Sequence, residues 1–105
     1  MVKFEKKIET VTKKEFEVKD GIYYAKIDDD NGCRFYKFIV KEDDEYEAVT
    51  VVDDTYNKLI RYDSWETTTS WNFERIFSGD KETSFIEEAE FKAHFINVMT
   101  SLSAL

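Results

Sequence analysis

The sequence predicts an α+β domain in which an antiparallel meander of five to six strands carries a C-terminal amphipathic helix on one face. Two observations lead to this fold class. Residues 15–52 alternate between strand-forming runs and turn signals, and Ser84–Leu105 has the apolar periodicity of a long helix. Because a sheet and a helix each bury one apolar side, they are expected to pack together as a single domain over residues 1–105.

The first fourteen residues fit two structures. Val2, Phe4 and Ile8 occupy the even positions of a strand, whereas Phe4, Ile8 and Val11 fit one face of a helix. The β-branched run at residues 10–12 favours the strand. Both alternatives stay open at this point.

Four strands of the meander are expected between residues 15 and 52. In chain order they are Glu15–Lys19, Ile22–Ile27, Cys33–Lys41 and Tyr46–Val52. The dipeptide Asp20-Gly21 is a strong hairpin signal and is expected to join the first two strands. The acidic run Glu42–Glu45 is expected to turn the chain into the fourth.

Two registers fit the hairpin that contains Asn31-Gly32. A two-residue loop would place Lys26 opposite Lys37, so that like charges face each other. A three-residue loop with its glycine in the left-handed conformation instead pairs Asp28 with Arg34. We therefore expect the second register.

The pattern is looser between residue 53 and the helix. Lys58–Tyr62 and Ser70–Phe77 are the expected strands, joined by the polar run at residues 66–70. In the second of these strands Trp71, Phe73 and Phe77 would share one side.

The helix begins with a capping box. The hydroxyl of Ser84 is expected to accept from the amide of Glu87, and the Glu87 carboxylate to reach back to the amide of Ser84. His94 and Asn97 fall on a narrow polar arc. The apolar surface is broader than one sheet face easily covers. Either its edge gives way to solvent, or one flank is a contact for a homodimer, and both alternatives stay open. That flank consists of Phe91, Phe95, Val98 and Leu102.

Charge and composition restrict the class of partner. The 105 residues carry a net charge of −8, and residues 42–57 contain seven acids and no base. Such a chain repels nucleic acid and anionic lipid, so we expect neither a direct nucleic-acid partner nor a membrane partner. A single cysteine and the lack of a stretch of about 20 apolar residues predict a soluble cytoplasmic protein.

Metal binding and catalysis have weak support. Asp28–Gly32 resembles the start of a calcium loop, but in that register the first and twelfth ligand positions are Ile27 and Phe38. A looser calcium site that also uses Asp53-Asp54 is the less favoured alternative. One histidine and one cysteine cannot complete a zinc site, and no catalytic motif is present. We therefore expect no metal, no cofactor and no enzymatic activity.

Two features remain as candidate binding sites. Trp65 and Trp71 flank a Thr/Ser run, and across a hairpin they could form a stacking platform for a small ligand. The second feature is a set of acids in the turns. Its members are Asp28, Asp29, Asp30, Glu42, Asp43, Asp44, Glu45, Asp53 and Asp54.

Carboxylates held on a rigid sheet can imitate DNA phosphates and occupy a basic surface of a nuclease or another nucleic-acid-binding protein. In composition the chain is similar to small acidic phage and mobile-element proteins that block host defence, including anti-CRISPR proteins, and to immunity proteins. The main functional hypothesis is therefore an inhibitor that binds a basic protein partner. The alternative is a small-ligand-binding domain with an aromatic pocket around Trp65 and Trp71.

Overall fold

The computed structural model describes residues 1–7 and 12–105. Ile8 and Val11, on which the helical alternative for the first residues depends, lie outside the described residues. In chain order the elements are β1 (Val2–Lys7), β2 (Lys13–Val18), β3 (Gly21–Asp29), β4 (Gly32–Val40), β5 (Glu45–Asp53), β6 (Lys58–Glu66), α1 (Trp71–Phe77), β7 (Thr83–Phe85) and α2 (Glu88–Ser103).

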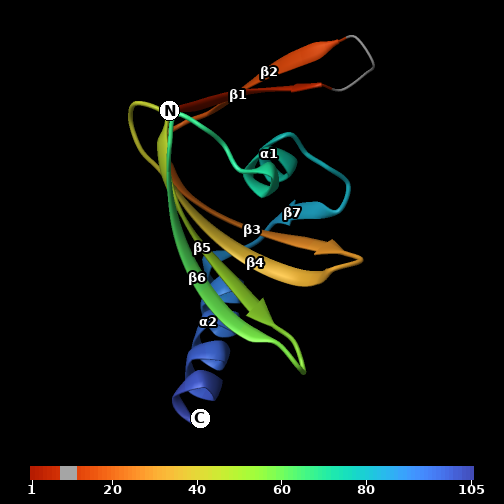
Figure 1. Cartoon of the computed structure of the whole chain (residues 1–105), viewed down its shortest axis with the longest axis vertical. Coiled ribbons are helices and arrows are strands. Elements are labelled where there is room, and N and C mark those ends of the chain that lie inside the picture. Colours follow the sequence, from red (N-terminus) through yellow and green to blue (C-terminus); the bar gives the residue numbers. More distant parts are fainter. Residues whose placement is uncertain (8–11) are drawn as a thin grey trace.

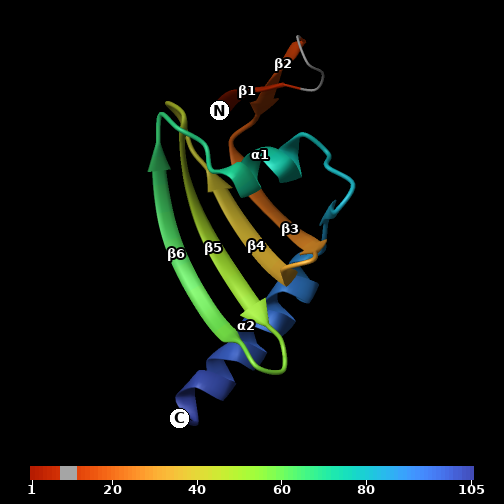
Figure 2. The same ribbon diagram turned by 45° about the vertical axis from the view of Figure 1, so that its right-hand side comes forward.

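A five-stranded antiparallel sheet with the strand order β6-β5-β4-β3-β7 forms the middle of the molecule (Figure 1). Helix α2 packs on one face of this sheet. Helix α1 and the separate two-stranded sheet β1-β2 lie on the other side, as Figure 2 shows. The structure confirms the predicted fold class, which is an α+β fold with an antiparallel sheet and a C-terminal helix.

Each face of the sheet has its own apolar core. Because alternate residues of a strand point to opposite faces, Tyr36 and Phe38 of β4 enter one core and Phe35 enters the other. The first core lies between the sheet, α1 and the β1-β2 sheet, and it is rich in aromatic rings. The second core lies beneath α2 and includes Val51, Phe91 and Val98 together with Phe35.

The predicted hairpin between Glu15–Lys19 and Ile22–Ile27 is wrong, because β2 pairs with β1 and not with β3. Val2 lies opposite Val18 in the β1–β2 ladder, and both side chains are buried in the first core together with Phe4. These two strands must leave the main sheet in order to cover its face with those apolar side chains.

The Asp20-Gly21 dipeptide therefore bends the chain from β2 into β3. Gly21 has a φ of +153°, a backbone conformation that residues with a Cβ rarely adopt. The amino group of Met1 pairs with the carboxylate of Asp20 and donates to the carbonyl of Lys41 at 2.7 Å. These contacts tie the bend to the end of β4.

The β3–β4 hairpin has neither of the two registers considered above. Asp28 lies opposite Cys33, and the loop consists of Asp30-Asn31, followed by a glycine with a φ of +102°. The guanidinium of Arg34 still finds an aspartate, but its partner is Asp29, at 3.1 Å. The predicted register depended on attraction between Arg34 and Asp28, and in the structure Arg34 makes this ion pair with the next aspartate, Asp29.

The predicted strand at Ser70–Phe77 is a helix, α1. The side chain of Ser70 accepts from the amide of Phe73 at 3.1 Å and so caps the helix. Phe73 and Ile76 are fully buried, and Phe77 packs beside them. This spacing of three and four residues places all three side chains on one helical face, which a strand would divide between its two sides.

Helix α2 begins at Glu88, and the predicted capping box at Ser84 is absent. Ser84 lies in β7, which pairs with β3, and the amide of Ile86 donates to the carbonyl of Tyr24 at 3.0 Å. These sheet hydrogen bonds hold the segment extended. Glu87 is the residue at the N-cap, and it makes no side-chain capping bond.

Most of the α2 flank that was predicted for self-association faces the sheet, although Leu102 at its end is exposed. Phe91 and Val98 are buried against Phe35 and Val51, so a second copy has no access to the centre of that flank. The residues predicted for this self-association contact were Phe91, Phe95, Val98 and Leu102. The opposite flank is exposed instead, with Ile96 61% exposed.

The two serines provide a test of the helix assignments. Ser70→Ala should lower the free energy of unfolding by about 1 kcal/mol, because the substitution removes the capping acceptor of α1. Ser84→Ala should change it by less than about 0.5 kcal/mol, because Ser84 is exposed and caps no helix. Urea denaturation of both variants measures the difference, and equal losses would contradict the assignment.

Candidate functional site

The acidic turns gather at two ends of the main sheet, as their positions in the meander predict. The Asp30 end, as we call it, holds Asp28–Asp30 and Asp53-Asp54. The Asp43 end holds Glu42–Glu45 together with Asp20. Their carboxylates fall into two groups: some are buried in ion pairs, and others face solvent.

Asp29 is a structural acid at the Asp30 end. Its carboxylate accepts from Arg34 at 3.1 and 3.2 Å and from Arg75 at 2.9 Å, and its side chain is only 8% exposed. The hydrogen bonds from Arg34, followed by that from Arg75, hold the pKa of Asp29 well below its ordinary value of 3.8. Asp29 is therefore unavailable to a partner.

Arg75 joins three segments at the same place. This buried side chain of α1 also contacts Asp80 at 3.3 Å and Glu82 at 3.0 Å, both in the connection to β7. Its guanidinium lies 4.6 Å from the centroid of the Trp71 ring. Arg75 thus links helix α1, the β3–β4 turn and the loop that leads to β7.

Asp53 anchors α2 in a similar way. Its carboxylate accepts from His94 at 2.8 Å and from Asn97 at 2.9 Å, and it pairs with Lys58. Burial opposes ionisation of Asp53, but these hydrogen bonds outweigh that effect and lower its pKa. His94 also stacks on Phe35, with 3.8 Å between ring centroids. Part of the predicted polar arc of the helix therefore faces the sheet.

The Asp30 end is hollowed on both sides of Asn31. One hollow of about 380 Å³ is lined by Trp71, by Lys81 and by the Arg75 cluster, which consists of Arg75 and its partners Asp29, Asp80 and Glu82. The other, of about 470 Å³, is lined by Asp54 and Tyr56 of the β5–β6 turn. Trp71 is 68% exposed and Tyr56 is 94% exposed. This end therefore presents large aromatic rings beside solvent-facing carboxylates.

The Asp43 end also mixes acids with cations, as does the Asp30 end with Arg34, Lys58, Arg75 and Lys81. An open depression of about 700 Å³ there is lined by Asp20, Glu42, Asp43 and Asp44, but also by Met1, Lys3 and Lys19. Asp43 and Asp44 both have a φ near +60°, and the backbone amide of Lys3 donates to the carboxylate of Asp44 at 3.4 Å. Cations from two segments, the start of β1 and the connection between β2 and β3, thus lie beside these acids.

The two tryptophans do not form the predicted platform, because residues 66–77 contain a helix and not a hairpin. Trp65 is half-buried in the first core and stacks on Tyr46, with 6.2 Å between ring centroids. Trp71 lies on the outer surface of α1. The structure therefore does not support an aromatic pocket shared by these two residues.

A smaller apolar groove does lie beneath α2. It has a volume of about 210 Å³ and is lined by Tyr24, Lys37, Val49, Phe91, Lys92 and Phe95. Neither tryptophan reaches it, and its volume is below the roughly 300 Å³ at which small-molecule sites usually begin.

The residues considered for nucleophilic and metal chemistry have other surroundings. Burial raises the pKa of the Cys33 thiol, which disfavours the reactive thiolate. His94 is held by Asp53, as described above. Within residues 1–7 and 12–105, no group of three or more His, Cys, Asp or Glu side chains is placed to hold a metal ion.

Comparison with known proteins finds no matching family model, no matching curated protein and no matching solved structure. None of the helices in the described part of the chain is long and apolar enough to span a membrane.

The depressed pKa of Asp29 makes stability depend on pH. Ionised Asp29 stabilises the fold fully above the pKa of the unfolded chain, and this contribution is lost as the pH falls from about 4 towards the lower pKa of the folded state. Asp29→Asn should therefore be less stable than wild type at pH 7, with a gap that narrows below pH ~4. Urea denaturation at several pH values measures this gap.

Asp28→Asn is the matched control, because the neighbouring Asp28 is exposed and makes no ion pair among the described residues. Its free energy of unfolding should follow that of the wild type across the same pH range. A gap for Asp29→Asn that stays constant from pH 7 to pH ~2 would contradict the role assigned to this carboxylate.

Proposed function

We propose that this protein is a non-enzymatic inhibitor that binds a basic surface of a partner protein through its Asp30 end. The observation that carries the proposal is the pairing of free carboxylates with exposed aromatic rings there. Asp30 lines the hollow that is walled by Trp71, and Asp28 is exposed two residues earlier in the chain; neither has an ion-pair partner among the described residues.

The internal ion pairs support this assignment. Asp29 and Asp53 form ion pairs with the buried and half-buried cations of the fold. Asp28 and Asp30 therefore have no structural ion pair to maintain and remain available to a partner. Long-range attraction between a net charge of −8 and a basic surface speeds association and gives it a strong salt dependence. Asp29 and Asp53 themselves are removed from the proposed contact surface, because their carboxylates are buried.

The aromatic rings add a short-range contribution. Tryptophan, tyrosine and arginine are the residue types that most often dominate the energy of protein interfaces. An arginine of the partner can stack on Trp71 or Tyr56 while it pairs with a neighbouring carboxylate. The depression at the Asp43 end is lined by acids and lysines but by no aromatic ring.

The Asp30 end is also held in place before binding. Its turns close two adjacent hairpins of the sheet, and the Arg75 cluster fixes one of them to α1. Carboxylates that are already positioned lose little conformational entropy on binding, as is true of the phosphates of a DNA duplex. This supports mimicry of DNA towards a nuclease or another nucleic-acid-binding protein, in the cytoplasm of a bacterial host if the chain is phage-encoded.

Variants at the Asp30 end that remove charge or an aromatic ring test the proposal. Asp28→Asn/Asp30→Asn and Trp71→Ala should each weaken binding of the basic partner by roughly 10-fold or more, because they remove surplus charge and an aromatic anchor. The measurement is an affinity capture from cells of the source organism, followed by titration of the captured protein at low and high salt.

Glu42→Gln/Asp43→Asn is the matched control, because it removes the same charge from the opposite end. It should reduce affinity by less than about threefold. Equal losses at both ends would indicate that only total charge matters. Unchanged affinity in the Asp30-end variants would refute the proposed site.

A further inference from the structure

Strand β6 leaves a long and regular edge of the main sheet unpaired. It is the terminal strand in the order β6-β5-β4-β3-β7, and all nine of its residues pair in continuous register with β5, with no bulge. Figure 2 shows no other strand beside its outer side, and the C-terminal end of α2 extends past the lower end of this edge. Proteins usually protect such edges, because their free N–H and C=O groups are templates for another strand. The opposite edge is formed by β7, which has only three residues.

The sequence of β6 is complementary to itself when read in the antiparallel direction. With Tyr62 on a twofold axis, Arg61 lies opposite Asp63 of the second copy and Lys58 lies opposite Glu66 of the second copy. Leu59 lies opposite Trp65 in the same arrangement. From these observations we propose that two copies of this chain join through β6 and form one continuous ten-stranded sheet.

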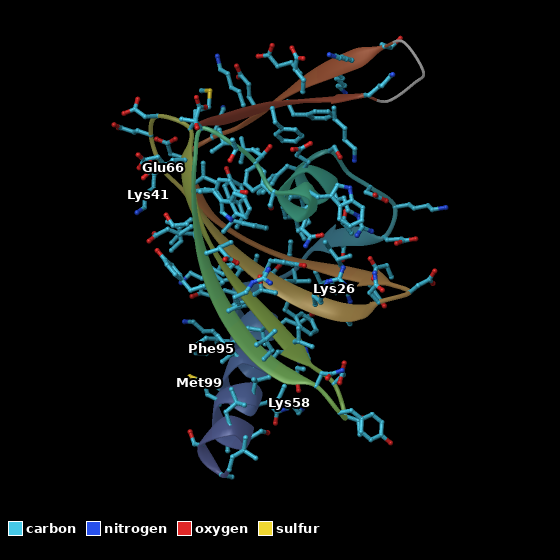
Figure 3. The ribbon with its side chains drawn as sticks, viewed as in Figure 1. Lys26, Lys41, Lys58, Glu66, Phe95 and Met99 are labelled. Carbon is cyan, nitrogen blue, oxygen red and sulfur yellow. The ribbon has the colours of Figure 1, made fainter. Side chains whose placement is uncertain are left out.

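The charges favour this register. Each dimer contains two Arg61–Asp63 pairs between copies, because the twofold axis repeats every contact, and Lys58, which pairs with Asp53 in its own copy, also lies opposite Glu66 of the second copy. Figure 3 labels Lys58 and Glu66, which lie at opposite ends of the strand as the pairing requires. Within one copy Arg61 and Asp63 already contact each other at 2.8 Å, with 59% and 35% of their side chains exposed. In the dimer each of the four Arg61 and Asp63 side chains would have an oppositely charged neighbour along its own strand and another across the interface.

The exposed apolar side chains of β6 also find partners. Leu59 is 47% exposed and would pack on the half-buried Trp65 of the second copy, while Tyr62, 58% exposed, would meet its own symmetry mate. Antiparallel pairing keeps each face of the sheet on the same side. The two α2 helices would therefore lie on one face of the joined sheet, with the exposed Met99 and Ile96 available for contact.

Charge reversal tests the pairing directly. Arg61→Asp places two acids opposite each other, and Asp63→Arg places two bases opposite each other, so each variant alone should raise the dimer dissociation constant by roughly 10- to 100-fold. An equimolar mixture of the two variants should form a heterodimer, because each acidic strand then faces a basic one. Light scattering during size-exclusion chromatography measures the mass, and native mass spectrometry identifies the heterodimer.

Two further proteins make the result decisive. The double variant Arg61→Asp/Asp63→Arg restores opposite charges and should dimerise like wild type. Lys81→Asp makes the same charge change as Arg61→Asp in an exposed loop and should leave dimerisation unchanged. A wild-type chain that remains monomeric at about 100 µM overturns the proposal. So does a mixture that forms no heterodimer while circular dichroism shows that both variants are folded.

Discussion

The buried guanidinium of Arg75 connects three segments of this structure. It reaches from α1 to Asp29 in the β3–β4 turn and to Asp80 and Glu82 before β7. A buried cation needs such partners, because an unpaired charge in this position would be strongly destabilising. The same guanidinium lies against the ring of Trp71, which is exposed at the surface. The ion pair that holds α1 on the sheet thus also shapes the candidate binding site.

This arrangement divides the acids of a highly acidic chain into two groups. Asp29 and Asp53 neutralise buried or half-buried partners and fasten a helix to each face of the sheet. Asp28 and Asp30, next to the first of them in sequence, remain at the surface. Acids that contribute to the fold and acids that remain for a partner therefore lie side by side, and substitutions at neighbouring positions should act on different properties.

Several features could be predicted because they depend on local signals. The strands β3, β4 and β5 follow from runs of β-forming residues between acidic or glycine-containing turns, and their order as a meander follows from the short connections. The gathering of acidic turns at two ends follows from the same topology. The detailed partners could not be predicted in this way. Arg34 attracts an aspartate in either register, so charge alone could not distinguish Asp28 from Asp29.

The sequence by itself determined the fold class, the acidic character and the positions of most strands, because alternation, turn residues and net charge are properties of the chain. Tertiary structure decided which surface each segment covers. Strand β2 pairs with β1 and not with β3, because this pairing buries Val18 in the core over the sheet. Ser70 caps a helix, because the helical spacing buries Phe73 and Ile76 in that same core. Tertiary structure also held Ser84 in a strand beside β3. In each case burial shared among distant segments outweighed a local preference.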